Sequence, residues 1–386
     1  MRIGIPKEIL PEEMRVAATP ETVNKYVKMG FSVAIQAAAG EGIFLSDDDY
    51  RKAGASVVSD AEELFATSNV ILKVKQPVFN ANIQKHEAEM LREGSILITF
   101  LHPAAPANHP LVLMLQDRNI TSFTMDGIPR ISRAQRMDAL TSMSTVTGYR
   151  SVIIAANHLS KFIPMIGTAI GTVKPANFLI VGAGVVGLQA IATAKRLGAV
   201  VKVADIRDEA RKESASLGAK VAGFEVPPEL ALGEGGFAKA LPEPWLKKER
   251  EALEPFVKEA DVLILSALVP GEIAPVLIAQ RLVEAMNPGS VIVDVSIDQG
   301  GNCELTKLGC FTEKNGISIC GIANIPGQMA VHASWLYANN MYYYVENLFK
   351  KGLDNPDFED DIVKRSLVTH KKKILFEGAL KAMKAA

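Results

Sequence analysis

The sequence predicts an α/β protein with two doubly wound, parallel-sheet (Rossmann-like) domains and a cleft between them. Its 386 residues are enough for two domains of ordinary size, each with its own core. Short apolar runs alternate with amphipathic stretches in both halves, which favours parallel sheets with helices on both faces. The glycine-rich stretch FLIVGAGVVG follows one of these runs, as the first turn of a doubly wound domain does.

The first half of the chain carries five apolar runs of strand length. We predict strands at residues 2–5, 32–36, 70–73, 95–100 and 120–123. Between the first two, residues 20–29 have a helical pattern, with Thr19 as N-cap and Pro20 at a first-turn position. A surface loop rich in Gly, Pro and Ala is expected much later, at residues 227–244.

Two long helical patterns divide the chain into domains. One runs from residue 135 to 159 and leaves the first domain, and the other runs from 328 to 350 and returns to it. Strands of the second domain are predicted at 177–181, 200–204, 262–265, 291–295 and 317–320. We therefore expect a discontinuous domain of residues 1–135 and 327–386, and a second domain of residues 136–326.

The composition argues against a nucleic-acid-binding, membrane-spanning or secreted protein. Lys and Arg (42) nearly balance Asp and Glu (43) without a long basic run, which argues against nucleic-acid binding. No apolar run reaches the roughly 18 residues of a membrane-spanning helix, and the first residues are typical of a strand rather than a signal peptide. The three cysteines have no zinc-type spacing, so we expect free thiols in a reducing cytoplasm and no metal site.

The stretch FLIVGAGVVG predicts a dinucleotide site because it lies between a strand and a helix. Gly182 would make the tight turn, Gly184 would let the backbone approach a pyrophosphate, and Gly187 would let helix and strand pack closely. The helix N-terminus would offer N–H groups to the phosphates. The intervening cofactor-binding residues are Ala183, Val185 and Val186.

An acidic residue at the end of the next strand predicts the choice of nucleotide. Asp205 follows the strand VVKVA, where a carboxylate accepts hydrogen bonds from the ribose and repels a 2′-phosphate. Ile206 and Arg207, which follow Asp205, are further predicted cofactor-binding residues. The positive charge of Arg207 could weaken the discrimination against a 2′-phosphate. The cofactor is expected to be NAD(H) rather than NADP(H).

Several motifs outside the dinucleotide site resemble one known group of proteins. GIPKE, RVAATPE, KVKQP and IDQGGNCE resemble the alanine dehydrogenase and transhydrogenase superfamily over nearly the whole chain. PRISRAQRMD resembles a signature of the soluble NAD(H)-binding component, a separate alpha-subunit chain, of proton-translocating transhydrogenases, and alanine dehydrogenases lack it. GLQAIATAKRLGAVV, GGFAKALPE, GGNCELT and LVTHKKKI are similar to the same component.

The resemblance to transhydrogenases implies hydride transfer from a bound NADH and the residues that would hold this cofactor. Arg130, Gln135 and Asp138 would hold the nicotinamide carboxamide and its surroundings, and Phe237, Ala267 and Leu268 would add cofactor contacts. Hydride would pass from NADH to NADP⁺ on a partner subunit, coupled to proton movement through separate membrane subunits. The family also implies a homodimer, cytoplasmic and peripheral to the inner membrane through its partners. A solvated turn at the entry of a helix, capped by Ser132 or Arg133, is the structural alternative.

The alanine dehydrogenase resemblance implies a second reading. His102 matches that family's acid/base histidine, where a tyrosine is expected in most transhydrogenases, and Asp298 matches its aspartate, often not acidic in transhydrogenases. Arg15 and Lys75 would bind a carboxylate and a carbonyl oxygen. The alternative function is thus an NAD-dependent L-alanine dehydrogenase needing no partner. A non-catalytic NAD(H)-binding protein is the third possibility.

Overall fold

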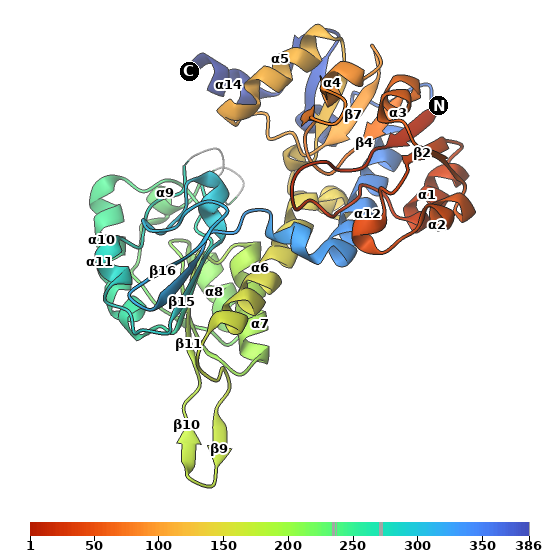
Figure 1. Cartoon of the computed structure of the whole chain (residues 1–386). Coiled ribbons are helices and arrows are strands. Elements are labelled where there is room, and N and C mark those ends of the chain that lie inside the picture. Colours follow the sequence, from red (N-terminus) through yellow and green to blue (C-terminus); the bar gives the residue numbers. More distant parts are fainter. Residues whose placement is uncertain (234–235, 237, 270–272, 386) are drawn as a thin grey trace. The chain divides into compact units, whose positions relative to one another are not determined.

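The computed structural model describes residues 1–233, 236, 238–269 and 273–385 (Figure 1). The chain divides into two units: Met1–Met143 with Pro326–Ala386, and Ser144–Ile325. The division falls inside helix α6 (Ala139–His158), whereas the sequence placed it at residue 135. No helix in the described ranges is both long and apolar enough to cross a membrane.

The first unit is built on a mainly parallel sheet. Its parallel strands follow the order β3-β2-β1-β4-β7-β8, which is the 3-2-1-4-5-6 order of a doubly wound fold. The C-terminal strands extend this sheet: β18 pairs antiparallel with β8, and β19 pairs antiparallel with β18. The bounds are β1 Arg2–Ile5, β2 Ser32–Gln36, β3 Ala55–Val58, β4 Val70–Leu72, β7 Ile96–Thr99, β8 Thr121–Thr124, β18 Leu367–His370 and β19 Lys373–Ile374, with a separate hairpin of β5 Phe79–Asn80 and β6 Lys85–His86.

Several helices of the first unit begin at side-chain caps that the sequence supplies. Thr19 forms a capping box with Thr22 at α1, and Asp360 accepts from Ile362 N–H at α13. The bounds are α1 Pro20–Lys28, α2 Asp47–Lys52, α3 Ala61–Thr67, α4 Glu87–Met90, α5 His109–Asp117, α12 Ala330–Leu348, α13 Asp361–Ser366 and α14 Glu377–Ala385. The segment 330–386 therefore returns to the unit in which the chain began.

The second unit repeats the same topology. Its sheet has the order β13-β12-β11-β14-β15-β17, again parallel, with β16 antiparallel at the edge. The strands are β11 Asn177–Val181, β12 Val200–Ala204, β13 Lys220–Val221, β14 Val262–Leu265, β15 Val291–Asp294, β16 Phe311–Lys314 and β17 Ile317–Cys320. The helices are α7 Val185–Arg196, α8 Asp208–Ser216, α9 Pro228–Ala231, α10 Glu243–Glu259 and α11 Gln280–Val283. Apolar clusters cover both faces of this sheet, as the near-continuous apolar strands require.

A two-stranded hairpin extends away from the rest of the second unit (Figure 1). It consists of β9 Ile166–Thr168 and β10 Gly171–Val173, which pair only with each other in the described sheets. Ile170 at its tip is fully exposed, and Phe162 and Met165 beside it are also exposed. An isolated hairpin is marginally stable in water, so this one is expected to be covered by a further surface.

Most predicted elements are confirmed, and the exceptions have local causes. The strands at 2–5, 32–36, 177–181, 200–204, 262–265 and 317–320 and the cap at Thr19 are as predicted. The other predicted strands and the first helix shift by one residue at one or both ends, and the helix predicted at 328–350 is α12, two residues shorter at each end. The helix expected from residue 135 begins at Ala139, because residues 132–137 form a 3₁₀ helix (η4) and Asp138 caps α6. The loop expected at 227–244 contains α9 and the start of α10.

Candidate functional site

The glycine-rich turn has the geometry that a dinucleotide site needs. Gly182 has φ +88°, and a Cβ there would lie 2.7 Å from the backbone of Ser266 and Ala267. A Cβ on Gly187 would lie 2.0 Å from Gly182 O, so only glycine lets α7 pack this closely. A Cβ on Gly184, in contrast, meets no atom within 4 Å. Gly182 and Gly187 are therefore needed for packing, and Gly184 leaves space for a ligand at the start of α7.

Asp205 lies beside this turn, and both oxygens of its carboxylate accept hydrogen bonds. It accepts from Ala183 N–H at 2.7 Å, so it fixes the glycine-rich turn to the end of β12. Arg207 donates to it through Nε at 3.0 Å and Nη2 at 2.8 Å, and through its own backbone N–H. This bidentate pair is largely buried. A ribose hydroxyl at Asp205 would therefore meet the guanidinium of Arg207 as well.

The loop after β14 completes the predicted cofactor surface. Ala267 and Leu268 are half-buried there, and Ser266 Oγ donates to Gly182 O at 2.9 Å. The loops after β11 and β14 meet at the point where the strand order reverses, which is where open α/β sheets bind ligands. Phe237 lies outside the described residues.

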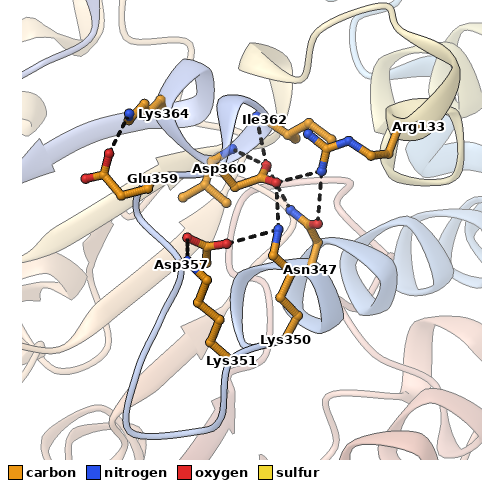
Figure 2. A network of polar contacts seen from close by, with 10 residues as sticks. Arg133, Asn347, Lys350, Lys351, Asp357, Glu359, Asp360, Ile362 and Lys364 are labelled. Carbon is orange, nitrogen blue, oxygen red and sulfur yellow. Dashed lines mark hydrogen bonds and ion pairs between the residues drawn. The ribbon is translucent and has the colours of Figure 1, made fainter.

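The turn with three arginines is held against the C-terminal helices of the first unit (Figure 2). Arg133 Nη1 donates to Asp360 Oδ2 at 2.6 Å, and Lys350 Nζ reaches the same oxygen at 2.7 Å. Asn347 and the start of α13 satisfy the other oxygen. Burial would raise the pKa of Asp360, but these donors outweigh it and hold that pKa well below its ordinary range. Asp360 is thus a charged anchor for the turn at physiological pH.

Arg136 provides the second anchor of the turn. Its guanidinium lies 3.7 Å from the ring centre of Tyr343 and hydrogen-bonds the Tyr343 hydroxyl, while Asn340 Nδ2 donates to its carbonyl at 2.9 Å. Ala134 and Met137 are buried below. The capping alternative for Arg133 is wrong, because its side chain pairs with Asp360, and no side-chain cap starts η4.

The three predicted nicotinamide residues differ in their surroundings. Arg130 and Gln135 are exposed. Asp138 accepts from Thr141 N–H at 2.8 Å and from Thr141 Oγ1 at 2.6 Å, so its carboxylate caps α6. Arginine anchors thus fix the backbone of the turn, and the structure leaves the Gln135 side chain facing outward.

Three of the four residues of the alternative amino-acid site, Arg15, Lys75 and His102, lie in the first unit. Arg15 is buried, and Glu13 accepts from its Nε at 2.7 Å and its Nη2 at 2.5 Å. Burial would raise the pKa of Glu13, but Arg15 outweighs it, Lys75 adds to the effect, and the pKa lies below its ordinary value. Glu13 therefore neutralises the very guanidinium that the alternative assigns to a substrate carboxylate.

His102 follows β7 in a left-handed conformation, with φ +45°. Its ring stacks on Phe100, and its Nδ1 lies 3.5 Å from Asp126 Oδ2. Burial would raise the pKa of Asp126, but His102 and Thr124 outweigh it and keep the carboxyl ionised. Asp298 lies in the other unit, exposed in the 3₁₀ helix η6 (Val295–Gln299).

Two buried features were not assigned from the sequence: the ion-pair cluster at Lys73 and the carboxyl group of Glu249. Lys73 is fully buried between Glu8 at 3.3 Å and Glu87 at 3.0 Å, at the strand-order reversal of the first unit. Glu249 lies on the buried side of α10 with Leu253, and burial together with the charge of Asp205 raises its pKa to about 7. An acid at an apolar helical position was the signal that could have found Glu249.

Comparisons with known proteins place the chain. Its residues 4–147 match the alanine dehydrogenase/PNT N-terminal domain, and residues 151–377 match the alanine dehydrogenase/PNT C-terminal domain. The chain belongs to the alanine dehydrogenase/PNT family. The resemblance predicted from the motifs is confirmed, and so is the class of fold.

Relatives of both branches of the family match. An NAD(P) transhydrogenase alpha-subunit chain of Rhodospirillum rubrum is 42% identical over 346 residues, 89% of each chain. A transhydrogenase structure from Sinorhizobium meliloti has a TM-score of 0.84 and 37% identity, covering 97% of this chain and all of that one. Alanine dehydrogenase of Methanococcus maripaludis is 34% identical over 391 residues, 99% of this chain and 96% of the relative. The fold is shared by both branches, and identity is higher to the transhydrogenases.

The described residues fit NAD(H), the cofactor expected in this family. The open space at Gly184, the N-terminus of α7 and the carboxylate of Asp205 match the pyrophosphate and ribose of a dinucleotide. NAD(H) would supply the hydride or accept it. The chain's own residues would bind it and fix its orientation.

We predict that NADH binds at least about tenfold more tightly than NADPH, which corresponds to roughly 1.4 kcal/mol. A 2′-phosphate would approach the carboxylate of Asp205, although Arg207 offsets part of the repulsion. Fluorescence titration of both nucleotides measures the ratio. Asp205→Ala should bring the two affinities together, and Asp208→Ala, in the first turn of α8, is the matched control. Comparable wild-type affinities would remove the ribose role from Asp205.

Proposed function

We propose that this chain is the NAD(H)-binding subunit of a proton-translocating transhydrogenase. It would present the nicotinamide of NADH to NADP⁺ held on a partner subunit. Hydride transfer between two nicotinamides requires no acid or base from the protein. It requires one ring to be held at the right distance and with the right face toward the other.

The anchored turn at residues 130–136 is the observation that carries this proposal. Arg133 and Arg136 hold its backbone on α12 and α13, while Gln135 remains exposed. A rigid turn with an outward amide can orient a carboxamide without covering the face of the ring. The identity to the R. rubrum transhydrogenase alpha-subunit chain supports the same assignment.

The alanine dehydrogenase alternative is supported less well. Its carboxylate-binding arginine, Arg15, is buried with two of its donors on Glu13. A substrate carboxylate would have to share that guanidinium with a charged neighbour. His102 is partly exposed and next to Asp126, so an acid/base role remains chemically open to it.

The proposal includes partners. By analogy with the transhydrogenase relatives, an NADP(H)-binding beta subunit and a membrane-spanning subunit would complete the enzyme and hold this chain at the inner membrane from the cytoplasmic side. We also propose a homodimer. The projecting hairpin β9–β10, with exposed Ile170 and Met165, is the element that we expect a second copy to cover.

Hydride transfer with and without a partner tests the proposed function. Alone, the protein should be inert with NADH toward pyruvate and ammonium, and with NAD⁺ toward L-alanine. Mixed with an NADP(H)-binding transhydrogenase subunit, it should transfer hydride directly between the nicotinamides. His102→Ala should leave this transfer largely intact, because the reaction needs no titrating group.

An alanine dehydrogenase would behave in the opposite way. Turnover of L-alanine would need no partner, and His102→Ala would lower it by about 100-fold or more. Partner-free turnover that disappears in this variant would overturn the proposed function. Gel filtration of the wild type against a protein lacking residues 165–173 tests the dimer separately.

A further inference from the structure

The motif IDQGGNCE has no chemical role in the proposed function, yet the side chain of its asparagine, Asn302, makes four hydrogen bonds. Asn302 is fully buried where β14 and β15 end. Its Oδ1 accepts from Ala267 N–H at 3.0 Å and from Ser296 Oγ at 2.7 Å. Its Nδ2 donates to Ala267 O at 2.9 Å and to Pro275 O at 2.8 Å.

These four bonds use the whole hydrogen-bonding capacity of the amide. The orientation of the amide is also fixed, because a backbone N–H can only donate and a backbone carbonyl can only accept. Asn302 therefore holds both backbone groups of Ala267, as a neighbouring strand would. Leucine lacks these groups, and aspartate lacks the two donors.

The backbone of Asn302 is itself fixed. Asp294, at the end of β15, accepts from Asn302 N–H and Cys303 N–H, both at 2.9 Å. Gly301, with φ +84°, lies so close that a Cβ would be 2.8 Å from the Asp294 carboxylate. The two glycines of the motif thus let the chain fold back over Asp294 and direct Asn302 at the loop after β14.

Ala267 in turn lies against the glycine-rich turn. A Cβ on Gly182 would lie 2.7 Å from Ala267 N, and Ser266 Oγ donates to Gly182 O. Any shift of the loop after β14 is therefore transmitted to the turn at which the pyrophosphate is expected. We propose that Asn302 is a positioning residue that sets the Ala267 backbone against Gly182 and so determines the affinity for the dinucleotide.

The inference rests on the proposed dinucleotide site, and Asn302→Ser tests it. Serine keeps a hydroxyl and leaves room for water, so the fold should survive while the direct hold on Ala267 is lost. We expect NADH affinity to fall by at least about tenfold, since small misplacements of binding groups have large effects. In the nucleotide-free protein, hydrogen exchange at the Ala267 amide should become faster.

Ser296→Ala is the matched control. It removes one hydrogen bond from the same buried amide but leaves both bonds to Ala267 in place. It should lower the melting temperature while NADH affinity and exchange at Ala267 stay as in the wild type. If Asn302→Ser does not fold, Asn302→Asp carries the same comparison, because it keeps the shape and removes the two donors.

The outcomes separate the two proposals. A wild type that does not bind NADH contradicts the proposed dinucleotide site itself. A wild type that binds NADH, with an Asn302 variant that binds it equally well, overturns the positioning role. Equal losses of affinity in the Asn302 variant and in Ser296→Ala would also overturn it, because general destabilisation would then explain both.

Discussion

Gly184→Ala should fold like the wild type and yet bind NADH at least about tenfold more weakly. The new methyl group meets no protein atom within 4 Å, and the backbone at Gly184 has φ −75°, which alanine adopts without strain. The methyl would instead point into the space in which the turn approaches a pyrophosphate. Thermal melting and fluorescence titration of NADH measure the two properties independently.

Gly187→Ala is the contrasting variant. Its methyl would lie 2.0 Å from Gly182 O, so α7 would have to move away from the turn. Overpacking of this kind costs about 1–3 kcal/mol, and we expect both stability and NADH affinity to fall. Unchanged affinity in Gly184→Ala would mean that the open space at α7 does not hold the dinucleotide.

Much of the fold could be predicted because it depends on local pattern. The buried parallel strand β14 is apolar throughout and β11 is apolar after its first residue, Asn177, so both could be recognised as apolar runs. Thr19 and Pro20 identify the start of α1 for an equally local reason.

Elements with weak patterns were missed. Edge strands β16 and β13 are largely exposed, so they lack an apolar run, and the hairpin β9–β10 is exposed along its length. Central strands can be identified because their residues are buried within the chain and are therefore apolar. An element that is exposed in the isolated chain carries no such pattern.

The glycine-rich turn and Asp205 could be chosen from sequence because their spacing fixes them on one strand–helix–strand unit, β11–α7–β12. For the turn at residues 130–136, the sequence could not show which side chains anchor the turn and which remain exposed. Arg133 and Arg136 resemble Arg130 in sequence, and what separates them is contact with Asp360 and Tyr343, more than 200 positions away. Asn302 is a similar case, since its partner Ala267 lies 35 positions away, in the loop after β14.

This distribution of roles gives the last prediction: Gln135→Ala should lower partner-dependent hydride transfer by roughly 100-fold. Affinity for NADH should change much less, because an interaction used mainly in the reactive geometry affects the rate rather than binding. Stability should stay within about 0.5 kcal/mol, as for most exposed positions, since Arg133 and Arg136 hold the turn without Gln135.

Single-turnover transfer, nucleotide titration and melting curves of the same Gln135→Ala protein distinguish the possible roles of the turn. Gln116→Ala, on α5 of the same unit, controls for the loss of a glutamine as such. Arg133→Ala provides the opposite case: it releases the ion pair with Asp360, so stability and transfer rate should fall together. If Gln135→Ala transfers hydride at the full rate while Arg133→Ala does not, the turn acts through its backbone or through Arg130, and the amide has no part in orienting the ring.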